Sequence, residues 1–386
     1  MSNEEQGRVP DLLHSEFFRH VDREHPVQIT PGPFEVSPAV LDAASRAVVG
    51  HRSNAFRKIV ADNARMLLEA FEIPEHEDYV PVVLTGTGTA AMEAMVASTA
   101  PAGRPLVLVN GRFSQRLADI ATIHNPSTEV LSFGVGEKID VVRVEQRIQG
   151  TPDIDYLLFG VQDTRECILN PFDDLCRVAK KHNLRLCVDA ISAMIAERLQ
   201  ASELKIDFFT ASSGKAIRSL PGLGIVCGRR EAFESLGAGV CRSYYLNLYE
   251  HYLVQAHQKE PRFAPAVSLH VCLNQALAEL LDEGVAARRE RIGCRTTRVR
   301  EFLRARGATF LRPEDDMPHS ITSVLLPEGF HFSQFHEALQ EMGFLVYSGS
   351  SVVRDCFQIG TGGYLTDEVL EEGLTAIHRV LQNLKP

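Results

Sequence analysis

Lys215 stands in a loop of small residues, within the segment SSGKAIRSLPG at 212–222. A lysine amine that is withdrawn from water has a lowered pKa and becomes a nucleophile able to form a Schiff base with a carbonyl compound. Only eight of the 40 basic residues of the chain are lysines, so arginine is the default surface cation here. Taken alone, a lysine at such a position is more often an exposed loop residue. Its function therefore has to be inferred from the groups around it.

An acidic residue, Asp189, ends the apolar run LRLCVDA at 184–190, 26 residues before Lys215. A carboxylate at the end of such a run is partly buried and needs a partner. The protonated nitrogen of a pyridinium ring is a suitable partner, and a charged nitrogen is what lets such a ring accept carbanion electrons. The alternative is that Asp189 simply caps the helix that follows.

A threonine–glycine turn in the segment LTGTGTAAMEAM could bind an anion. Thr87, Gly88 and Thr89 lie where an apolar run passes into an amphipathic stretch. Small residues let backbone N–H groups approach a phosphate, hydroxyls add donors, and a helix N-terminus favours negative charge. The alternative is a tight strand–helix turn with a threonine as the N-cap.

Two further loops hold candidate residues. Phe113, in VNGRFSQR, could stack on a heterocycle, although an aromatic at this place is more often part of the core. Thr164 lies in the cluster Asp163–Glu166, ahead of a helix opened by Pro171. Such clusters are mostly solvated loops with capping roles, so neither loop decides the function by itself.

These groups share one feature, which is that each follows a short apolar run rich in β-branched or aromatic residues. Amphipathic stretches separate many of the runs, and this alternation predicts an α/β fold with a mainly parallel, seven-stranded sheet covered on both faces. Ligands of such sheets bind beyond the carboxyl ends of the strands. The expected strands are 81–85, 105–109, 128–133, 156–161, 184–190, 207–211 and 223–228.

The chain divides into three expected parts. Residues 1–35 are irregular and acidic and read as an N-terminal arm, and 36–255 form the large ligand-binding domain. Residues 256–386 begin with a long amphipathic helical segment and continue as strand, helix, two strands and helix. This last part is expected to be a helical linker and a small α+β C-terminal domain.

Composition narrows the class of protein. A net charge of −10 gives no reason to expect nucleic acid or an anionic membrane as a partner. No apolar run approaches the roughly 20 residues that span a bilayer. The eight cysteines are scattered without CxxC pairs or histidines at metal-binding spacing, so no metal site is expected. A reduced, cytoplasmic protein is the simplest interpretation.

The joint order of these groups points to pyridoxal 5′-phosphate (PLP), which needs an anion turn, a stacking aromatic, an acid and a lysine. In this order the sequence resembles the class V aminotransferases of fold type I, in particular the alanine–glyoxylate and 2-aminoethylphosphonate–pyruvate branches. The resemblance runs from about residue 30 to the C-terminus. It is carried by TPGP, GHRS, GTGTAAMEA, NGRFSQR, ILNP, VDAIS, SSGKAIRSLPGLGIV and SYYLNLYEHY.

The resemblance implies a role for each candidate residue. Lys215 would form the Schiff base with PLP, Asp189 would hold the pyridinium nitrogen, and Ile191 would lie against the ring. Phe113 would stack on the other face, and Thr164 would lie near the ring. The phosphate would be held by the turn of Thr87, Gly88 and Thr89. The resemblance also implies a homodimer whose active sites draw on both subunits.

Three positions depart from the family pattern. Gly214 replaces the Gln or Asn that commonly precedes the lysine and touches the phosphate, and Ala264 replaces a hydroxyl residue that the partner subunit usually lends. Gln358, in FQIGTGG, replaces the arginine that binds the substrate carboxylate. A neutral amide cannot form the charged bidentate contact of a guanidinium. Arg354 and Arg218 are candidates to substitute, although each is more often a surface or loop arginine.

Three functions therefore compete. The first is an aminotransferase acting on an amino acid or amino-phosphonate-like substrate, with Lys215 moving the proton. The second is a PLP-dependent lyase or decarboxylase of a bulky or S-linked amino acid, which the loss of an arginine at 358 favours because a lyase holds only one substrate. The third is a non-catalytic binding protein, which the pair Lys215 and Asp189 argues against.

Overall fold

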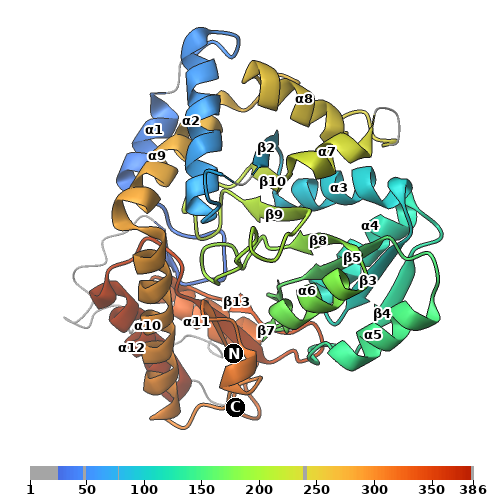
Figure 1. Cartoon of the computed structure of the whole chain (residues 1–386). Coiled ribbons are helices and arrows are strands. Elements are labelled where there is room, and N and C mark those ends of the chain that lie inside the picture. The colour runs from blue at the N-terminus through green and yellow to red at the C-terminus, as the bar shows by residue number, and fades with distance from the viewer. Residues whose placement is uncertain (1–24, 47–48, 77, 238–240, 384–386) are drawn as a thin grey trace, which may run out of the picture.

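A seven-stranded sheet forms the centre of the protein, described here from a computed structural model that covers residues 25–46, 49–76, 78–237 and 241–383 (Figure 1). The strand order is β2-β10-β9-β8-β5-β3-β4, and all pairs are parallel except those of β10. This confirms the expected α/β class, and all seven expected strands are present. They are β2 (Tyr79–Thr85), β3 (Pro105–Val109), β4 (Glu129–Ser132), β5 (Tyr156–Gly160), β8 (Arg185–Asp189), β9 (Phe208–Ser212) and β10 (Leu223–Arg229).

Helices cover both faces of this sheet, which is why its central strands are apolar on both sides. One face packs against α3 (Gly88–Thr99), α4 (Arg112–His124), α7 (Arg230–Leu236) and α8 (Leu248–Gln258). The other packs against α2 (Asn54–Ala70), α5 (Val141–Gly150), α6 (Phe172–Lys181) and α9 (Val267–Glu283). Helix α1 (Pro38–Ser45) lies beside α9, and a short 3₁₀ helix, η3 (Ala100–Ala102), follows α3.

The C-terminal part has its own core and its own three-stranded antiparallel sheet, in the order β11-β14-β13. Its strands and helices come in the expected order, with three strands before the last helix where the sequence predicted two. They are α10 (Val285–Arg304), η4 (Glu314–Asp316), β11 (Ile321–Leu325), α11 (Phe332–Glu341), β12 (Phe344–Leu345), β13 (Tyr347–Ser348), β14 (Cys356–Gly360) and α12 (Asp367–Asn383).

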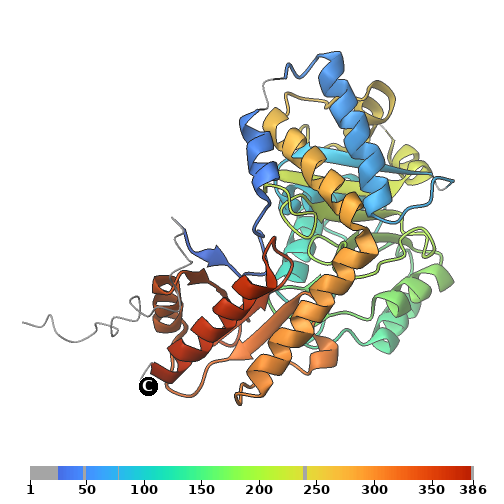
Figure 2. The same cartoon turned by 90° about the vertical axis from the view of Figure 1, so that its left-hand side faces the viewer.

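The described part of the N-terminal arm joins this small domain. Strand β1 (Val27–Gln28) pairs in parallel with β12, and the buried Val27 and Ile29 belong to the small-domain core. Residues 1–24 lie outside the described part of the chain. Helix α9 packs in the core of the large domain, while α10 continues from it toward the small domain (Figure 2).

A two-stranded hairpin leaves the large sheet at the end of β5. It consists of β6 (Gln162–Asp163) and β7 (Ile168–Leu169), with Thr164 in the turn between them. The hairpin reaches the small domain, where Cys167 packs with Met317 and Ile321. The carboxyl ends of β2, β5, β8 and β9 lie at one edge of the sheet, and the hairpin connects this edge with the small domain. None of the described helices is long and apolar enough to cross a membrane.

Candidate active site

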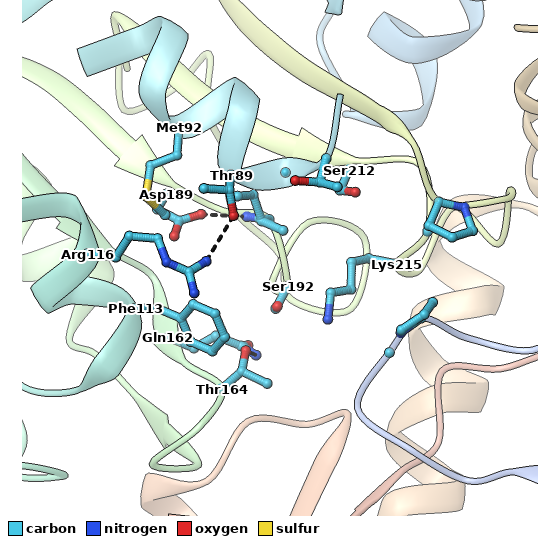
Figure 3. A pocket seen from close by; sticks show the side chains of 17 residues that line it. Thr89, Met92, Phe113, Arg116, Gln162, Thr164, Asp189, Ser192, Ser212 and Lys215 are labelled. Carbon is cyan, nitrogen blue, oxygen red and sulfur yellow. Dashed lines mark hydrogen bonds between the residues drawn. The ribbon is translucent and has the colours of Figure 1, made fainter. Parts of the chain in front are cut away.

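A cavity of about 330 Å³ lies at the carboxyl ends of the central strands (Figure 3). The structure brings eight residues of the expected site together in its wall, from five separate segments of the chain. They are Thr87, Gly88, Thr89, Phe113, Thr164, Asp189, Ile191 and Lys215. Gly32, Pro33, Met92, Arg116, Gln162, Ser192, Ser212, Gly214 and Pro221 complete the lining.

Lys215 reaches into the cavity from the loop between β9 and β10. Its Nζ donates a hydrogen bond of 2.9 Å to the carbonyl oxygen of Pro31. A Cβ on Gly32, which has a φ of +115°, would lie 2.7 Å from this Nζ, so only glycine fits here. Burial lowers the pKa of Lys215 to about 8, while the carboxylate of Asp189 acts in the opposite direction. A far larger fraction of this amine is therefore neutral near physiological pH than of an ordinary lysine, although the protonated form still predominates below pH 8.

Asp189 sits at the end of β8 and approaches the cavity from a different side. Its Oδ1 accepts hydrogen bonds from the backbone N–H of Ile191 at 3.0 Å and from the hydroxyl of Thr210 at 3.1 Å. Burial raises the pKa of Asp189, while the hydrogen bonds from Ile191 and Thr210 and the positive charge of Arg116 lower it. A buried carboxylate of this kind needs a cationic hydrogen-bond donor.

The N-terminus of α3 opens on the same cavity. Thr87 is the N-cap, and its side chain makes no capping hydrogen bond, which leaves its hydroxyl and the first N–H groups of α3 available to a ligand. A Cβ on Gly88 would lie 2.9 Å from the side chain of Ile191, so the turn packs closely on that wall. Thr89 accepts a hydrogen bond of 2.9 Å from Arg116.

Phe113 is fixed by a residue that sequence analysis placed in a solvated cluster. Asp163 is buried, and its Oδ2 accepts hydrogen bonds from the backbone N–H groups of Phe113 at 2.8 Å and Ser114 at 3.3 Å. Burial raises the pKa of Asp163, while these contacts lower it. The cluster is buried and not solvated, because the small domain covers the hairpin. The expected capping role is present, since Asp163 accepts hydrogen bonds from backbone N–H groups in the first turn of α4.

Arg116 is a lining residue that sequence analysis missed. Its guanidinium carbon lies 5.0 Å from the centre of the Phe113 ring, and Nη1 donates to Thr89. The available signal was spacing, since residues three apart on a helix share a face and Phe113 and Arg116 both lie on α4. Its contact with Thr89 depends on how α4 packs beside α3, which the sequence does not specify.

Comparison with known proteins agrees with this geometry. Residues 43–362 match the family model described as aminotransferase class-V. The chain is a class V aminotransferase. It is 31% identical over 340 residues to a 2-aminoethylphosphonate–pyruvate transaminase of Bacteroides fragilis, which covers 87% of this chain and 93% of the relative. It is 29% identical over 358 residues to a transaminase of the same name from Vibrio cholerae, covering 92% and 97%.

Solved structures place the class V aminotransferase among fold-type-I enzymes. An aspartate aminotransferase from Thermus thermophilus superposes with a TM-score of 0.82 at 25% identity, covering 92% of this chain and 99% of that one. A ureidoglycine–glyoxylate aminotransferase from Bacillus subtilis gives 0.87 at 22% identity, with 94% and 95% covered. The enzyme therefore depends on PLP, as the sequence predicts.

The residues of the cavity fit this cofactor. PLP supplies an aldehyde that condenses with amines and a pyridinium ring that accepts electrons. Asp189 presents a carboxylate that a pyridinium nitrogen could bind, and the N-terminus of α3 presents N–H groups and the Thr87 hydroxyl that a phosphate could bind. Lys215 offers a buried amine of lowered pKa for the aldehyde.

The three residues that depart from the family pattern differ in their burial and in their distance from the cavity. Gly214 lines the cavity, and a Cβ there would lie 3.0 Å from Pro221; Ala264 is exposed. Gln358 is buried, and its Nε2 donates to the backbone carbonyls of Thr164 at 2.7 Å and Arg165 at 3.3 Å. Arg354 is exposed on the loop before β14.

Arg218, the other arginine considered as a substitute, points away from the cavity. Its Nε donates to the carbonyl oxygen of Gly362 at 2.6 Å, and its Nη1 lies 3.9 Å from Glu283. Among the described lining residues, neither Gln358, Arg354 nor Arg218 is present. Arg354 and Arg218 therefore do not take the place of the carboxylate-binding arginine within this cavity.

Proposed function

We propose that this class V aminotransferase transfers an amino group from a small amine donor to a 2-oxo acid, with Lys215 carrying the proton. The observation that carries the proposal is the buried amine of Lys215, whose pKa lies at about 8 in a cavity that it shares with Asp189. A group with a pKa near working pH can both accept and return a proton. Transamination needs both steps from one base.

The other lining residues support this proposal through the cofactor. Asp189 would hold the pyridinium nitrogen, and Phe113 and Ile191 would confine the ring. Thr164 would bind near the ring, with its side chain in the cavity wall and 3.3 Å from the amide nitrogen of Gln162. The phosphate would be held by Thr87, Gly88 and Thr89.

The names of the relatives suggest the substrate class. Both curated relatives are named for 2-aminoethylphosphonate and pyruvate. We propose an amino-phosphonate or a small amino acid as the donor and pyruvate as the first acceptor to test. Gln358 and Arg354 remain candidates for substrate binding. The buried amide of Gln358 supports an indirect role, because it holds the backbone of the loop that carries Thr164.

The test follows the cofactor and both products. Purified enzyme is incubated with 2-aminoethylphosphonate, alanine or aspartate, and the conversion of the bound cofactor to its amine form is followed by absorbance. Pyruvate should then restore the original spectrum with formation of alanine. A matched Lys215→Ala variant should bind cofactor that borohydride no longer fixes to the protein. Fixation of the cofactor to this variant would refute the assignment of Lys215.

The same assay separates transfer from bond cleavage. A lyase or decarboxylase would release ammonia, a thiol or CO₂ and would leave no amine form of the cofactor for pyruvate to reoxidise. The lyase alternative rests on the loss of an arginine at 358, while the curated relatives reported above are transaminases. Release of ammonia without transfer to pyruvate would overturn the proposal.

We also propose a cytoplasmic homodimer. All eight cysteines are free, which suits a reducing compartment. An exposed aromatic cluster offers a surface for a second copy: Tyr244 and Tyr245 are 78% and 42% exposed and pack against Phe263. Tyr245 also donates to the carbonyl oxygen of Thr85, at the start of the turn that leads to α3. A solution mass of one chain would refute the dimer, and Tyr244→Glu should weaken it.

A further inference from the structure

The junction between α9 and α10 lies against the loop that carries Lys215. α9 packs on the large domain, Gly284 with a φ of +87° ends it, and α10 continues toward the small domain. Arg288 stands in the first turns of α10 and is only 2% exposed. Its position makes it a contact between the domain junction and the large sheet.

Arg288 binds the backbone directly after the lysine. Its Nη1 donates to the carbonyl oxygens of Ala216 at 3.2 Å and Ile217 at 3.3 Å. Its Nε donates to Glu283 at 2.8 Å, so the carboxylate orients the guanidinium. Both carbonyl groups belong to buried residues, and buried carbonyls without a donor are costly.

The same loop is bound to the small domain by a second arginine. Arg218 has a φ of +62°, and its backbone N–H donates to the carbonyl oxygen of Lys215 at 2.7 Å, which closes the turn. Its side chain donates to Gly362, which follows β14. The loop is therefore bound on one side by α10 and on the other by the small domain.

We propose that Arg288, oriented by Glu283, is a positioning residue that fixes the backbone of residues 215–218 and so holds Lys215 Nζ in the cavity. The inference rests on Lys215 being the reactive lysine of the proposed function. Arg288 does not touch the cavity among the described residues, so it acts through the loop and not on the substrate.

Loosening this loop should raise the pKa of Lys215. Its pKa is lowered by burial, and the one charged group that acts on it from across the cavity, within the described residues, is Asp189, which raises it. If the carbonyls of Ala216 and Ile217 lose their donor, the loop moves toward water to solvate them. Lys215 then becomes more exposed, and the protonated form of its nitrogen becomes easier to form.

The test compares two arginines of the same ion cluster in the full-length, cofactor-loaded enzyme. Arg291 also binds Glu283, with its Nε at 2.8 Å, but within the described part of the chain it forms no hydrogen bond or ion pair with residues 212–219. The pH midpoint of the visible absorption of the lysine-bound cofactor is measured for wild type, Arg288→Met and Arg291→Met. Arg288→Met should raise the midpoint by about one pH unit, and Arg291→Met should leave it unchanged.

A structural role alone would give a different result. If Arg288→Met and Arg291→Met shift the midpoint equally, or neither shifts it, the proposal is wrong, even if both lower the melting temperature. Arg288→Lys keeps a donor, so its midpoint should lie between those of wild type and Arg288→Met. If Arg288→Met does not fold, Glu283→Gln, which keeps Arg288 but weakens its orientation, should raise the midpoint in the same direction; an unchanged midpoint would overturn the proposal. Amino transfer is assayed separately in wild type, so failure of transfer and failure of positioning are distinguishable.

Discussion

Gln358 and Thr164 are joined across the domain boundary by a hydrogen bond of 2.7 Å from the side-chain amide of Gln358 to the backbone carbonyl of Thr164. The two residues are 194 positions apart, one on β14 of the small domain and one in the hairpin that leaves the large sheet. The same amide nitrogen also reaches the carbonyl of Arg165. An amide at 358 thus holds the wall of the cofactor cavity in place.

Replacing this amide should disturb the loop and not only the substrate. Gln358→Glu keeps the shape but removes both donor hydrogens and places a carboxylate beside two carbonyl oxygens. We expect a loss of about 2–4 kcal/mol in the free energy of unfolding, since a buried charge without a partner adds to the lost hydrogen bonds. Urea denaturation of the two proteins measures it.

The control for this substitution is Gln340→Glu, an exposed glutamine on α11 of the same domain. It should change the unfolding free energy by no more than about 0.5 kcal/mol, as surface substitutions usually do. Equal effects at 340 and 358 would mean that added negative charge, and not the lost contacts with the Thr164 loop, causes the destabilisation.

Cofactor affinity should depend on Asp189 in a graded manner. Asp189→Asn removes the negative charge that a pyridinium nitrogen needs, and we expect the dissociation constant for PLP to rise about 10- to 100-fold, as for loss of a charged hydrogen bond. Thr210→Val removes only the hydroxyl that donates to Asp189 Oδ1, so a rise of roughly fivefold is expected. Equilibrium titration of cofactor-free protein measures both, and a larger effect of Thr210→Val would contradict the assignment of Asp189.

The uptake of cofactor should follow the ionisation of Lys215. Only the neutral amine attacks an aldehyde, and burial lowers the pKa of Lys215 from 10.5 to about 8. The rate of uptake by cofactor-free protein should therefore rise with pH up to about 8 and then level off. Stopped-flow absorbance gives this profile. A rate that keeps rising toward pH 10.5 would mean that the amine is not buried as the structure has it.

The sequence was sufficient for those parts of the site that follow directly from strand order. Lys215, Asp189 and the turn at Thr87 each come straight after a strand, and a mainly parallel sheet brings strand ends to one edge. Arg116 was missed because its contact with Thr89 depends on the packing of two helices. The role of Gln358 could not be predicted because it depends on where the small domain sits, 194 residues along the chain from Thr164.

The burial of Asp163 is another feature that the sequence alone could not predict. A cluster of charged residues in a loop is usually solvated, and nothing in the local sequence indicates that the small domain covers this one. In the structure Asp163 is buried against Gly111, where a Cβ would lie 2.4 Å from the carboxyl carbon. The close approach lets Oδ2 accept the N–H of Phe113. A glycine in the sequence NGRF is thus explained by an acid 52 residues later.

This contact gives a prediction that links packing to cofactor binding. Gly111→Ala should push the carboxyl group of Asp163 away and release the start of α4, which carries Phe113. Since overpacking costs about 1–3 kcal/mol, we expect a loss of that size in unfolding free energy together with weaker PLP binding. Denaturation and cofactor titration of the same preparations measure the two effects.

The matched control is Gly150→Ala at the end of α5, where a Cβ would meet no atom within 4 Å. It should raise the unfolding free energy by no more than about 1 kcal/mol, as Gly→Ala does at a compatible helical position, and leave the PLP dissociation constant unchanged. If the Gly111→Ala enzyme is less stable but binds PLP normally, the contact between Asp163 and Phe113 does not contribute to binding of the PLP ring. If Gly111→Ala lowers both the stability and the affinity for PLP, and Gly150→Ala lowers neither, the anchor from Asp163 to Phe113 is part of the cofactor site.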